Sequence, residues 1–502
     1  MSEVLAFLEA PETYGESGVQ RIDTHASHVF LAGEHAYKLK RPVKFPFMDF
    51  STLDKREHAA REELRLNRRT APELYLRVEA VVRRNGFLAR TETPTASDEL
   101  LDWLVVMRRF DQDALLSAIA ERGELSATHV DSLRDAVVAL HREPSIRDID
   151  WVSAMKWVVE DNIDELRSFA SVFEDQGMID EAVTASSRFF DEDIEFLRAR
   201  AQAGWIKRCH GDLHLGNVAW LEGRAVLFDA LEFNEALATI DSLYDAAFLI
   251  MDLVARGFRT LAFRFLNGML DRNRDEDGLV LLPLYLATRA IIRAKVAAAL
   301  AQSGGNKQSV AAANHYLSVA MPCLTMEPPR LIAIGGLSGT GKSTVSQQLG
   351  PAFGTPGARW LRSDVIRKLQ AGIGELERLP DSAYGPGTSA PVYGEMLTRA
   401  ERSLRAGHPV ILDAVFARES ERDRAQALAE SLAVPFTGIW LEADVDLRKQ
   451  RVAARSGDAS DAGVDVVEKQ EDADLGEIRW HRVAAGHHAA TTVRDWINRS
   501  SG

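Results

Sequence analysis

Two stretches of the sequence carry residues suited to phosphoryl transfer. The first, Gly336-Leu-Ser-Gly-Thr-Gly341-Lys342-Ser343, fits the pattern of a phosphate-binding loop. Phosphate oxygens need several short donors from one side, and a glycine-permitted backbone at the start of a helix presents them. We expect Lys342 to reach the β- and γ-phosphates and the Ser343 hydroxyl to hold Mg²⁺. The residues predicted to bind nucleotide here are Gly336, Leu337, Ser338, Gly339, Thr340, Gly341, Lys342, Ser343 and Thr344.

Three polar residues downstream of this loop indicate an acceptor and a metal. Asp364 and Arg367 follow the second apolar run of the segment, where ligands collect in open α/β sheets. The carboxylate is predicted to orient or deprotonate an acceptor hydroxyl, and the arginine to bind an acceptor anion. A helix-capping aspartate with a surface arginine is the alternative. Asp413 ends the apolar run HPVILD and suits a Mg²⁺-side carboxylate, although aspartate is also a common turn residue.

Arginines recur near the C-terminus at three- and four-residue spacing. Arg448, Arg451 and Arg455 would share one helical face and bring several cations to the transferring phosphate. We predict that Arg451 and Arg455 bind nucleotide. A solvated charged face is an equally open alternative.

The second stretch is HGDLHLGN, residues 210–217, followed after a short apolar run by Asp229. Phosphoryl transfer needs a carboxylate to receive the acceptor proton, and an amide with a second carboxylate to hold Mg²⁺. Asp212 is predicted to be the base, and Asn217 and Asp229 the metal ligands. A metal site made by the two histidines of the stretch is the alternative, but its two glycines disfavour the helix that such a site needs.

The arrangement of apolar runs predicts the elements that position these residues. After residue 331, short apolar runs alternate with helical patterns, which is typical of a parallel sheet wrapped by helices. Upstream, strand-like runs surround one charged helix, and a mainly helical stretch follows. A proline-rich connector, MPCLTMEPPR, separates the two parts. We therefore predict a mixed α/β multidomain chain with segments 1–110, 111–320, 321–330 and 331–502.

Composition excludes several classes of protein. The 502 residues are 46% hydrophobic and carry a net charge of −14, which is typical of a globular chain and disfavours a protein that coats nucleic acid. Two cysteines cannot form a disulfide framework. The most apolar stretch, 279–301, is interrupted by proline and three basic residues, so we expect no membrane span. The start carries no basic region typical of a secretory signal, so we predict a cytoplasmic protein, whose oligomeric state stays open.

Residues 331–502 resemble the small P-loop kinases, the group that contains gluconate kinase, adenylylsulfate kinase, polynucleotide 5′-kinase and zeta-toxin-like kinases. The resemblance rests on the phosphate-binding loop and on LRSDVIRK. It implies that Asp364 and Arg367 form the acceptor-binding pair and that the arginine-bearing helix is a mobile lid. The resemblance identifies a class of enzyme and no particular substrate.

Residues 27–320 resemble the aminoglycoside phosphotransferase and choline kinase branch of the protein-kinase-like fold, which has a small α+β lobe and a mainly helical lobe. The resemblance rests on His210-Gly-Asp212 followed by Asn217, and on Asp229. Asp229 is followed by Ala-Leu-Glu rather than Phe-Gly, which disfavours a protein kinase. In place of a glycine-rich loop, the segment FLAGEH before residue 38 has a single glycine.

The same resemblance implies further nucleotide-binding residues. Lys38 corresponds to the strand lysine that contacts the phosphates, and Glu63 to its partner on a helix. Lys40 remains an alternative for the lysine, and Glu62 or Glu57 for the glutamate, because strand and helix registers are not determined by one sequence. The run DWLVVMRRF corresponds to the hinge between lobes, with Val106 and Met107 lining an adenine slot.

Together the two segments resemble a bacterial two-module architecture. The resulting hypothesis is a bifunctional phosphotransferase that uses ATP and Mg²⁺ to phosphorylate small hydroxylated molecules, with one site per module. In one alternative, one module is a nucleotide-binding regulator or sensor of the other. In another, the chain is an ATP-binding or ATPase stress-response protein without small-molecule kinase activity.

Overall fold

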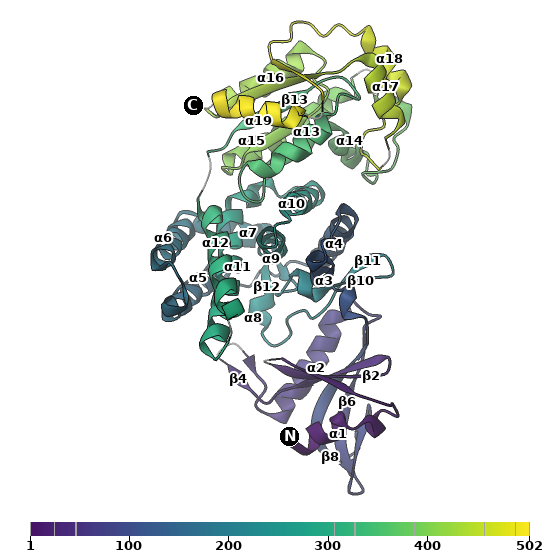
Figure 1. The fold of residues 1–502 in the computed structure, drawn as a ribbon, viewed down its shortest axis with the longest axis vertical. Coiled ribbons are helices and arrows are strands. Elements are labelled where there is room, and N and C mark those ends of the chain that lie inside the picture. Colours follow the sequence, from purple (N-terminus) through teal and green to yellow (C-terminus); the bar gives the residue numbers. More distant parts are fainter. Residues whose placement is uncertain are drawn as a thin grey trace. The chain divides into compact units, whose positions relative to one another are not determined.

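The computed structural model describes residues 2–24, 26–45, 48–305, 307–325, 328–384, 387–455, 457–486 and 488–500. The chain forms two compact units. Unit 1 comprises Met1–Trp157 and Leu197–Asp252, and unit 2 comprises Val158–Phe196 and Leu253–Gly502. Figure 1 draws the ribbon and labels many of their helices and strands. Both units mix helices and strands, which confirms the predicted fold class.

Unit 1 is built on a six-stranded antiparallel sheet of order β1-β2-β3-β8-β6-β7. Its strands are β1 (Gln20–Asp23), β2 (Ser27–Ala32), β3 (His35–Lys40), β6 (Tyr75–Arg84), β7 (Phe87–Thr91) and β8 (Glu99–Arg108). Apolar side chains alternate along the strands, so each face of the sheet packs against a helix. Helix α2 (Leu53–Asn67) covers one face of the sheet, and α1 (Ser2–Glu9) covers the other.

The rest of unit 1 is small hairpins and helices that carry the 210–217 stretch. The two-stranded sheets pair β4 (Lys44–Phe45) with β5 (Met48–Asp49), β9 (Ile206–Arg208) with β12 (Thr239–Asp241), and β10 (Val218–Leu221) with β11 (Arg224–Leu227). The helices are α3 (Leu116–Glu121), α4 (Ala127–Leu140) and α8 (Glu235–Ala238), with the short η1 (Pro11–Thr13), η2 (Gln112–Ala114) and η4 (Leu215–Asn217). Three helices span the sequence positions at which the chain passes from one unit to the other. They are α5 (Trp151–Ser168), α7 (Ile194–Ala203) and α9 (Ser242–Ala255).

Unit 2 contains a five-stranded parallel sheet of order β14-β15-β13-β16-β17. Its strands are β13 (Leu331–Gly335), β14 (Arg359–Arg362), β15 (Val410–Asp413), β16 (Phe436–Glu442) and β17 (His481–Ala484). The central strand β13 is buried along its whole length, as a strand covered on both faces must be. Helices α13 (Lys342–Leu349) and α19 (Ala489–Ser500) cover one face, and α15 (Ser389–Arg405) and α16 (Glu419–Ser431) the other. The predicted parallel sheet is confirmed.

The remaining elements of unit 2 are helical. They are α6 (Gln176–Glu192), α10 (Arg259–Asn273), α11 (Leu282–Gln302), α12 (Lys307–Leu324), α14 (Ser363–Gln370), α17 (Val445–Ala453) and α18 (Val464–Glu471), with η3 (Ala170–Val172), η5 (Glu276–Val280), η6 (Gly350–Ala352) and η7 (Asp381–Tyr384). In the described parts of the chain, no helix has the length and apolar character needed to cross a membrane.

The proline-rich segment 321–330, predicted to connect two parts of the chain, is partly helical. Helix α12 continues to Leu324 with Pro322 inside its last turn. Pro322 has no backbone N–H to donate to the carbonyl oxygen four residues earlier, so this last turn lacks one hydrogen bond. Residues 326 and 327 lie outside the described residues. The two compact units do not follow the four predicted segments, since unit 2 combines helices from segment 111–320 with the P-loop sheet. The division into four segments therefore stays a proposal.

A buried ion-pair network explains why these helices belong with the P-loop sheet. Glu276 of η5 is fully buried and lies 3.1 Å from Arg359 of β14 and 2.7 Å from Arg399 of α15. Asn267 of α10 accepts a hydrogen bond from the Trp360 backbone N–H at 2.7 Å. Burial alone would raise the pKa of Glu276, but the two arginines more than offset this effect and lower it. The network therefore anchors β14 to α10 and η5.

Candidate active sites

The loop between β13 and α13 has a backbone that glycine alone adopts without strain. Gly336, Gly339 and Gly341 have φ angles of 142°, 85° and 89°. A Cβ on Gly336 would lie 2.6 Å from the Leu441 carbonyl oxygen, and one on Gly339 would lie 2.6 Å from that of Arg448. Positive φ and this close approach both exclude larger residues. The loop is therefore a backbone cradle before a helix N-terminus, which fits a phosphate chain.

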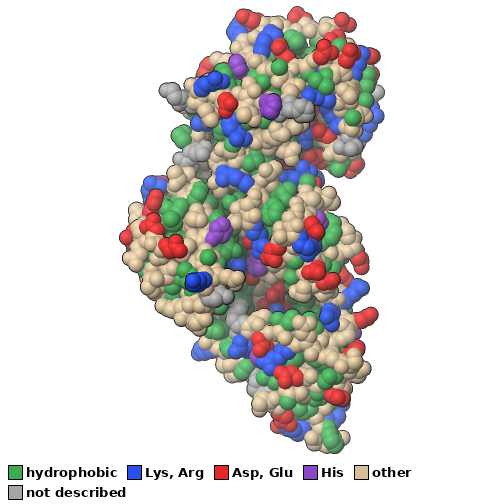
Figure 2. Space-filling view, viewed as in Figure 1, with side chains coloured by type: hydrophobic (Ala, Val, Ile, Leu, Met, Phe, Trp, Pro, Cys, Tyr) green, Lys and Arg blue, Asp and Glu red, His purple; other side chains and the backbone are tan. Residues whose placement is uncertain are grey.

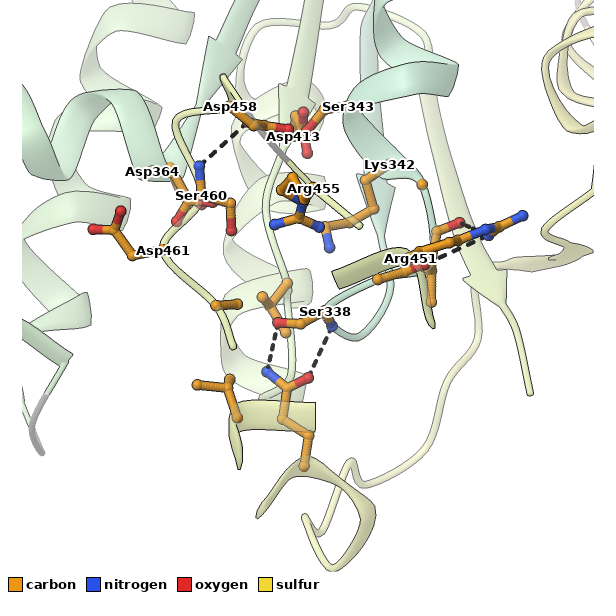
Figure 3. Close-up of a pocket in the computed structure, with 18 of the residues that line it drawn as sticks. Ser338, Lys342, Ser343, Asp364, Asp413, Arg451, Arg455, Asp458, Ser460 and Asp461 are labelled. Atoms are coloured by element: carbon orange, nitrogen blue, oxygen red, sulfur yellow. Dashed lines mark hydrogen bonds between the residues drawn. The ribbon is translucent and has the colours of Figure 1, made fainter. Parts of the chain in front are cut away.

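A cavity of about 1070 Å³ opens over this cradle (Figure 3). Every predicted loop residue from 338 to 344, Thr344 included, lines it. Gly336 and Leu337 are not among its lining residues. Leu337 instead packs against the core of unit 2. The cavity is large enough for a nucleotide and a second small molecule.

Lys342 is the cation of the cradle. Its Nζ donates to the Leu337 carbonyl oxygen at 3.3 Å, and no carboxylate of the described residues lies within ion-pair distance. Burial lowers the pKa of Lys342, and Asp413 and Asp364 oppose the shift only in part. A half-buried ammonium that lines a cavity and has no paired carboxylate in the described residues fits an anionic ligand.

Ser343 and Asp413 form the predicted metal pair. Asp413 ends β15, is 4% exposed, and lines the same cavity as Ser343. Burial raises the pKa of Asp413, whereas Arg362 and Lys342 lower it. A hydroxyl and a carboxylate are hard oxygen donors, so this pair fits Mg²⁺ held through few protein ligands.

The predicted acceptor residues both lie on α14. Asp364 is in its first turn and lines the cavity. Arg367 also lines the cavity, but its guanidinium donates to the Ala383 carbonyl oxygen at 2.9 Å and the Ser389 hydroxyl at 3.2 Å. It also lies over the Tyr384 ring. Arg367 thus holds the loop that borders the cavity, and only its Nε, in the described part of the chain, has no partner.

The three arginines of the C-terminal pattern have different surroundings. Arg448 is buried and donates to the Ser338 carbonyl oxygen at 3.0 Å, so it supports the cradle from inside the protein. Arg451 donates weakly to the Gly339 carbonyl oxygen at 3.5 Å and to that of Ala485 at 3.2 Å. Arg455 lines the cavity, and its Nη1 is buried with no hydrogen-bond partner in the described residues. Figure 3 shows Arg451 and Arg455 on opposite sides of Lys342.

Two contacts of this site have no signal in the sequence. Gln470 of α18 accepts from the Ser338 N–H at 2.8 Å and donates to its hydroxyl at 3.1 Å. Arg362, the last residue of β14, reaches Ser343 and Asp413. Both residues are ordinary polar side chains in the sequence, and only the fold brings them to the cradle.

In unit 1, Lys38 of β3 joins a carboxylate from α2 and one from the loop after β11. Its Nζ lies 2.8 Å from Glu63 and is also paired with Asp229. Burial alone would lower the pKa of Lys38, but the two carboxylates hold it well above its usual value. The alternatives Glu57 and Glu62 instead pair with Arg61 and Arg65 on the helix surface.

Lys40, the alternative lysine, lies in the same cluster. It is 2% exposed, lies 2.5 Å from Glu63, and forms an ion pair with Glu232. Burial raises the pKa of Glu232, and Lys40 opposes the shift. Glu63 therefore bridges two lysines. Lys38 is the more accessible of the two, with 15% of its side chain exposed.

The 210–217 stretch presents its polar side chains together. Asn217 Nδ2 donates to Asp212 Oδ2 at 3.1 Å and to the Asp212 carbonyl oxygen at 2.9 Å. Asp229 has φ 61°, which is unusual for a residue with a side chain, and its N–H donates to the Tyr75 hydroxyl at 3.1 Å. Such backbone strain concentrates at functional sites. The Asp212 and Asp229 side chains are 45% and 40% exposed, so ligands can reach both.

Asp245 of α9 positions the 210–217 stretch, a role that was not predicted from the sequence. Its carboxylate accepts from the Gly211 N–H at 2.9 Å and the His210 N–H at 3.2 Å, and His141 lies 2.9 Å away. His210 Nε2 donates to the Phe228 carbonyl oxygen, and the His214 ring accepts from the Gly216 N–H. The histidines therefore have hydrogen-bonding roles. An aspartate within the apolar run SLYDAAFLIMDL was the available signal.

The predicted adenine-slot residues lie on opposite faces of β8. Met107 packs in the cluster on the face of Lys38 and α2, whereas Val106 packs against α1 and is fully buried. Successive side chains of a strand point to opposite faces, so one slot cannot use both. Met107 alone shares a face with Lys38, and the Val106 side chain is excluded from that face.

Comparison with known proteins gives a family and several similar folds. Residues 331–473 match the family model described as an AAA domain. Uncharacterised proteins of Mycobacterium tuberculosis and Mycobacterium bovis are 31% identical over 482 residues, which cover 92% of this chain and 91% of theirs. Among solved structures, a choline/ethanolamine kinase family protein of Mesorhizobium loti is 15% identical over 65% of this chain and 95% of its own, with TM-score 0.41. A gluconokinase of Sinorhizobium meliloti is 22% identical over 34% of this chain and 90% of its own, with TM-score 0.24.

The chain thus combines a unit built on an antiparallel sheet with a unit whose glycine-rich loop and parallel strands β13 to β16 fall within the residues matched by the AAA domain model. The chain belongs to the family of the two mycobacterial proteins, whose length it shares almost completely.

Proposed function

We propose that the chain is a bifunctional phosphotransferase that moves the γ-phosphate of ATP to small hydroxylated molecules, with one site in each unit. The observation that carries the proposal is the duplication of one chemical set. In unit 1, Lys38 pairs with Asp229, and the partly exposed Asp212 acts on Asp229. In unit 2, Lys342, Asp413 and Asp364 line one cavity. On the face drawn in Figure 2, acidic and basic side chains are interspersed, which fits a small-molecule substrate better than a nucleic acid.

In unit 1, Asp212 is the proposed base. Its carboxylate receives the proton of the acceptor hydroxyl as that oxygen bonds to the γ-phosphorus and the bond to the β-phosphate oxygen breaks. Asn217 orients Asp212 and, with Asp229, is placed to hold Mg²⁺. Lys38 is placed to bind the phosphates when it leaves Asp229, while Glu63 keeps it in position.

In unit 2, Asp364 is the proposed base and the cradle binds the phosphate chain. Lys342 binds the β- and γ-phosphates, and Ser343 and Asp413 are placed to hold Mg²⁺. Bound Mg²⁺ would neutralise charge that develops on the phosphate oxygens. Arg455, with an unpartnered Nη1 in the cavity, supplies a further donor to the transferring group.

Label transfer from γ-labelled ATP to a pool of small metabolites tests the proposal. The native chain should label at least two acceptors, D212N should lose one and D364N the other, each by about a hundredfold or more. Circular dichroism checks that both variants remain folded. Labelling that survives intact in both variants would contradict the proposed bases.

A second candidate function is regulation of unit 2 by a nucleotide sensor in unit 1. The observation that favours it is the direct pairing of Lys38 with Asp229, which occupies a proposed metal ligand. Under this alternative D212N leaves all label transfer unchanged, while D229N alters transfer by unit 2. The two single-site variants therefore separate two catalysts from one catalyst and a sensor.

A further inference from the structure

Arg362 lies beside the proposed metal pair because of the strand register. In the parallel pairing of β14 with β15, Arg362 is the partner of Asp413. Trp360, two residues earlier, shares its face of the strand, and the Arg362 guanidinium lies 4.9 Å from the centre of the Trp360 ring. The Trp360 indole N–H also donates to Asp413 at 3.3 Å. The strand thus carries both an aromatic support and a cation to the carboxylate.

The guanidinium contacts both groups assigned to Mg²⁺. Its Nη2 lies 3.5 Å from the Ser343 hydroxyl oxygen, and its Nε lies 3.9 Å from Asp413 Oδ2. Arg362 is not among the residues that line the cavity, and 13% of its side chain is exposed. It therefore reaches the metal pair from within the protein, where it can influence the pair without touching the nucleotide.

Two more carboxylates hold the guanidinium. Asp458, which lines the cavity, forms an ion pair with Nη2, and Glu375 lies 3.4 Å from Nη1. Figure 3 shows Asp458 next to Asp413 and Ser343. One guanidinium thus balances three carboxylates. Lys342 also acts on Asp413, and Arg455 acts on Asp458, so several cations share this cluster of carboxylates.

We propose that Arg362 is the resident counter-cation of the second site, a positioning residue that sets how strongly nucleotide binding there depends on Mg²⁺. The inference rests on the proposed nucleotide site of unit 2. In the metal-free chain Arg362 neutralises Asp413. Mg²⁺ held by Ser343 and Asp413 would compete with the guanidinium for Asp413, while Asp458 and Glu375 would keep the guanidinium paired.

The test compares the affinity of a non-hydrolysable ATP analogue with Mg²⁺ and with EDTA. The analogue is titrated by calorimetry into the full chain with D229N, which removes the proposed site of unit 1, so that the heat reports on the site of unit 2. The same titration with K342A added measures the heat that remains without the site of unit 2. R362Q removes a competing cation, so the ratio of the EDTA to the Mg²⁺ dissociation constant should rise about tenfold. D458N releases the guanidinium toward Asp413 and removes a nearby anion, so the same ratio should fall.

Two controls separate this role from loss of structure. R362K keeps the charge and should restore a ratio near that of the native arginine. R482Q removes a charge from an exposed pair with Glu442 in the same unit and should leave the ratio unchanged. If R362Q does not fold, the lower ratio of the two dissociation constants expected in D458N still tests the proposal.

The failures are distinguishable. A ratio that R362Q and D458N leave within twofold of the native value overturns the role of Arg362, while the nucleotide site stands. Absence of any analogue binding that K342A removes overturns the proposed function of unit 2 and this inference with it.

Discussion

The surroundings of several side chains in these sites shift their pKa values away from the usual values. No carboxylate in the described parts of the chain pairs with Lys342, and burial lowers its pKa. Two carboxylates pair with Lys38 and raise its pKa. The two lysines have the same proposed task in different electrostatic states. Lys342 is prepared for an anion, while Lys38 must exchange one carboxylate for phosphate.

His408 gives a residue-scale prediction about pH. It is buried before β15, and its Nε2 donates to the Gly357 carbonyl oxygen at 2.9 Å. Burial lowers its pKa from 6.5 to about 4. As pH falls through this window the unfolded chain binds the proton first, so the folded state loses stability, by about 3 kcal/mol when the loss is complete.

Chemical denaturation of the native chain and of H408Q at a series of pH values measures this effect. Glutamine can keep the hydrogen bond but does not titrate. The stability lost between pH 6.5 and 4 should therefore be smaller in H408Q by the stated amount. Parallel losses in both proteins would show that other groups cause the acid sensitivity.

At the scale of elements, β14 connects the helices of unit 2 with the P-loop site. Its first residue, Arg359, pairs with Glu276, and its last, Arg362, reaches the metal pair. Asn267 of α10 accepts from Trp360 and donates to the Ala358 carbonyl oxygen. The edge strand of the sheet therefore depends on α10 and η5 for its position.

The element-scale prediction concerns the Glu276 network. E276Q leaves Arg359 and Arg399 buried with one carboxylate fewer, and breaking a buried network costs about 3–5 kcal/mol. Urea denaturation of unit 2, followed by the fluorescence of its tryptophans, measures the loss. D277N removes only an exposed partner of Arg402 and should cost about 0–1 kcal/mol. Equal effects of the two substitutions would refute the role of the buried pair.

At the scale of the whole molecule, the chain divides into two compact units, and each contains one complete proposed phosphate site. The residues assigned to each proposed site all belong to one unit, so we expect each site to bind nucleotide by itself. Ligands that bind a folded unit stabilise it. The number of bound nucleotides is therefore the whole-molecule test.

Calorimetry with a non-hydrolysable ATP analogue and Mg²⁺ should give two nucleotides per chain. K342A should remove the site of unit 2 and D229N that of unit 1, so each variant binds one nucleotide and the double variant none. The heats of the two single variants should add to that of the native chain. A native stoichiometry of one would rule out two independent sites.

The sequence alone determined what depends on local pattern. The phosphate-binding loop, the parallel sheet around it and the group of Asp212, Asn217 and Asp229 follow from glycine positions, apolar runs and short spacings. A loop backbone and a buried strand are set by their own residues, so a single sequence carries their signal.

Only the tertiary structure decided what depends on distant contacts. It placed both Lys38 and Lys40 on Glu63, and Asp245 under the 210–217 stretch. It also gave Arg448, Arg451 and Arg455 three separate environments, although their spacing is regular. Charged side chains acquire a role from the partner that packing brings to them, and residues far apart in the chain leave no periodic pattern that reveals that partner.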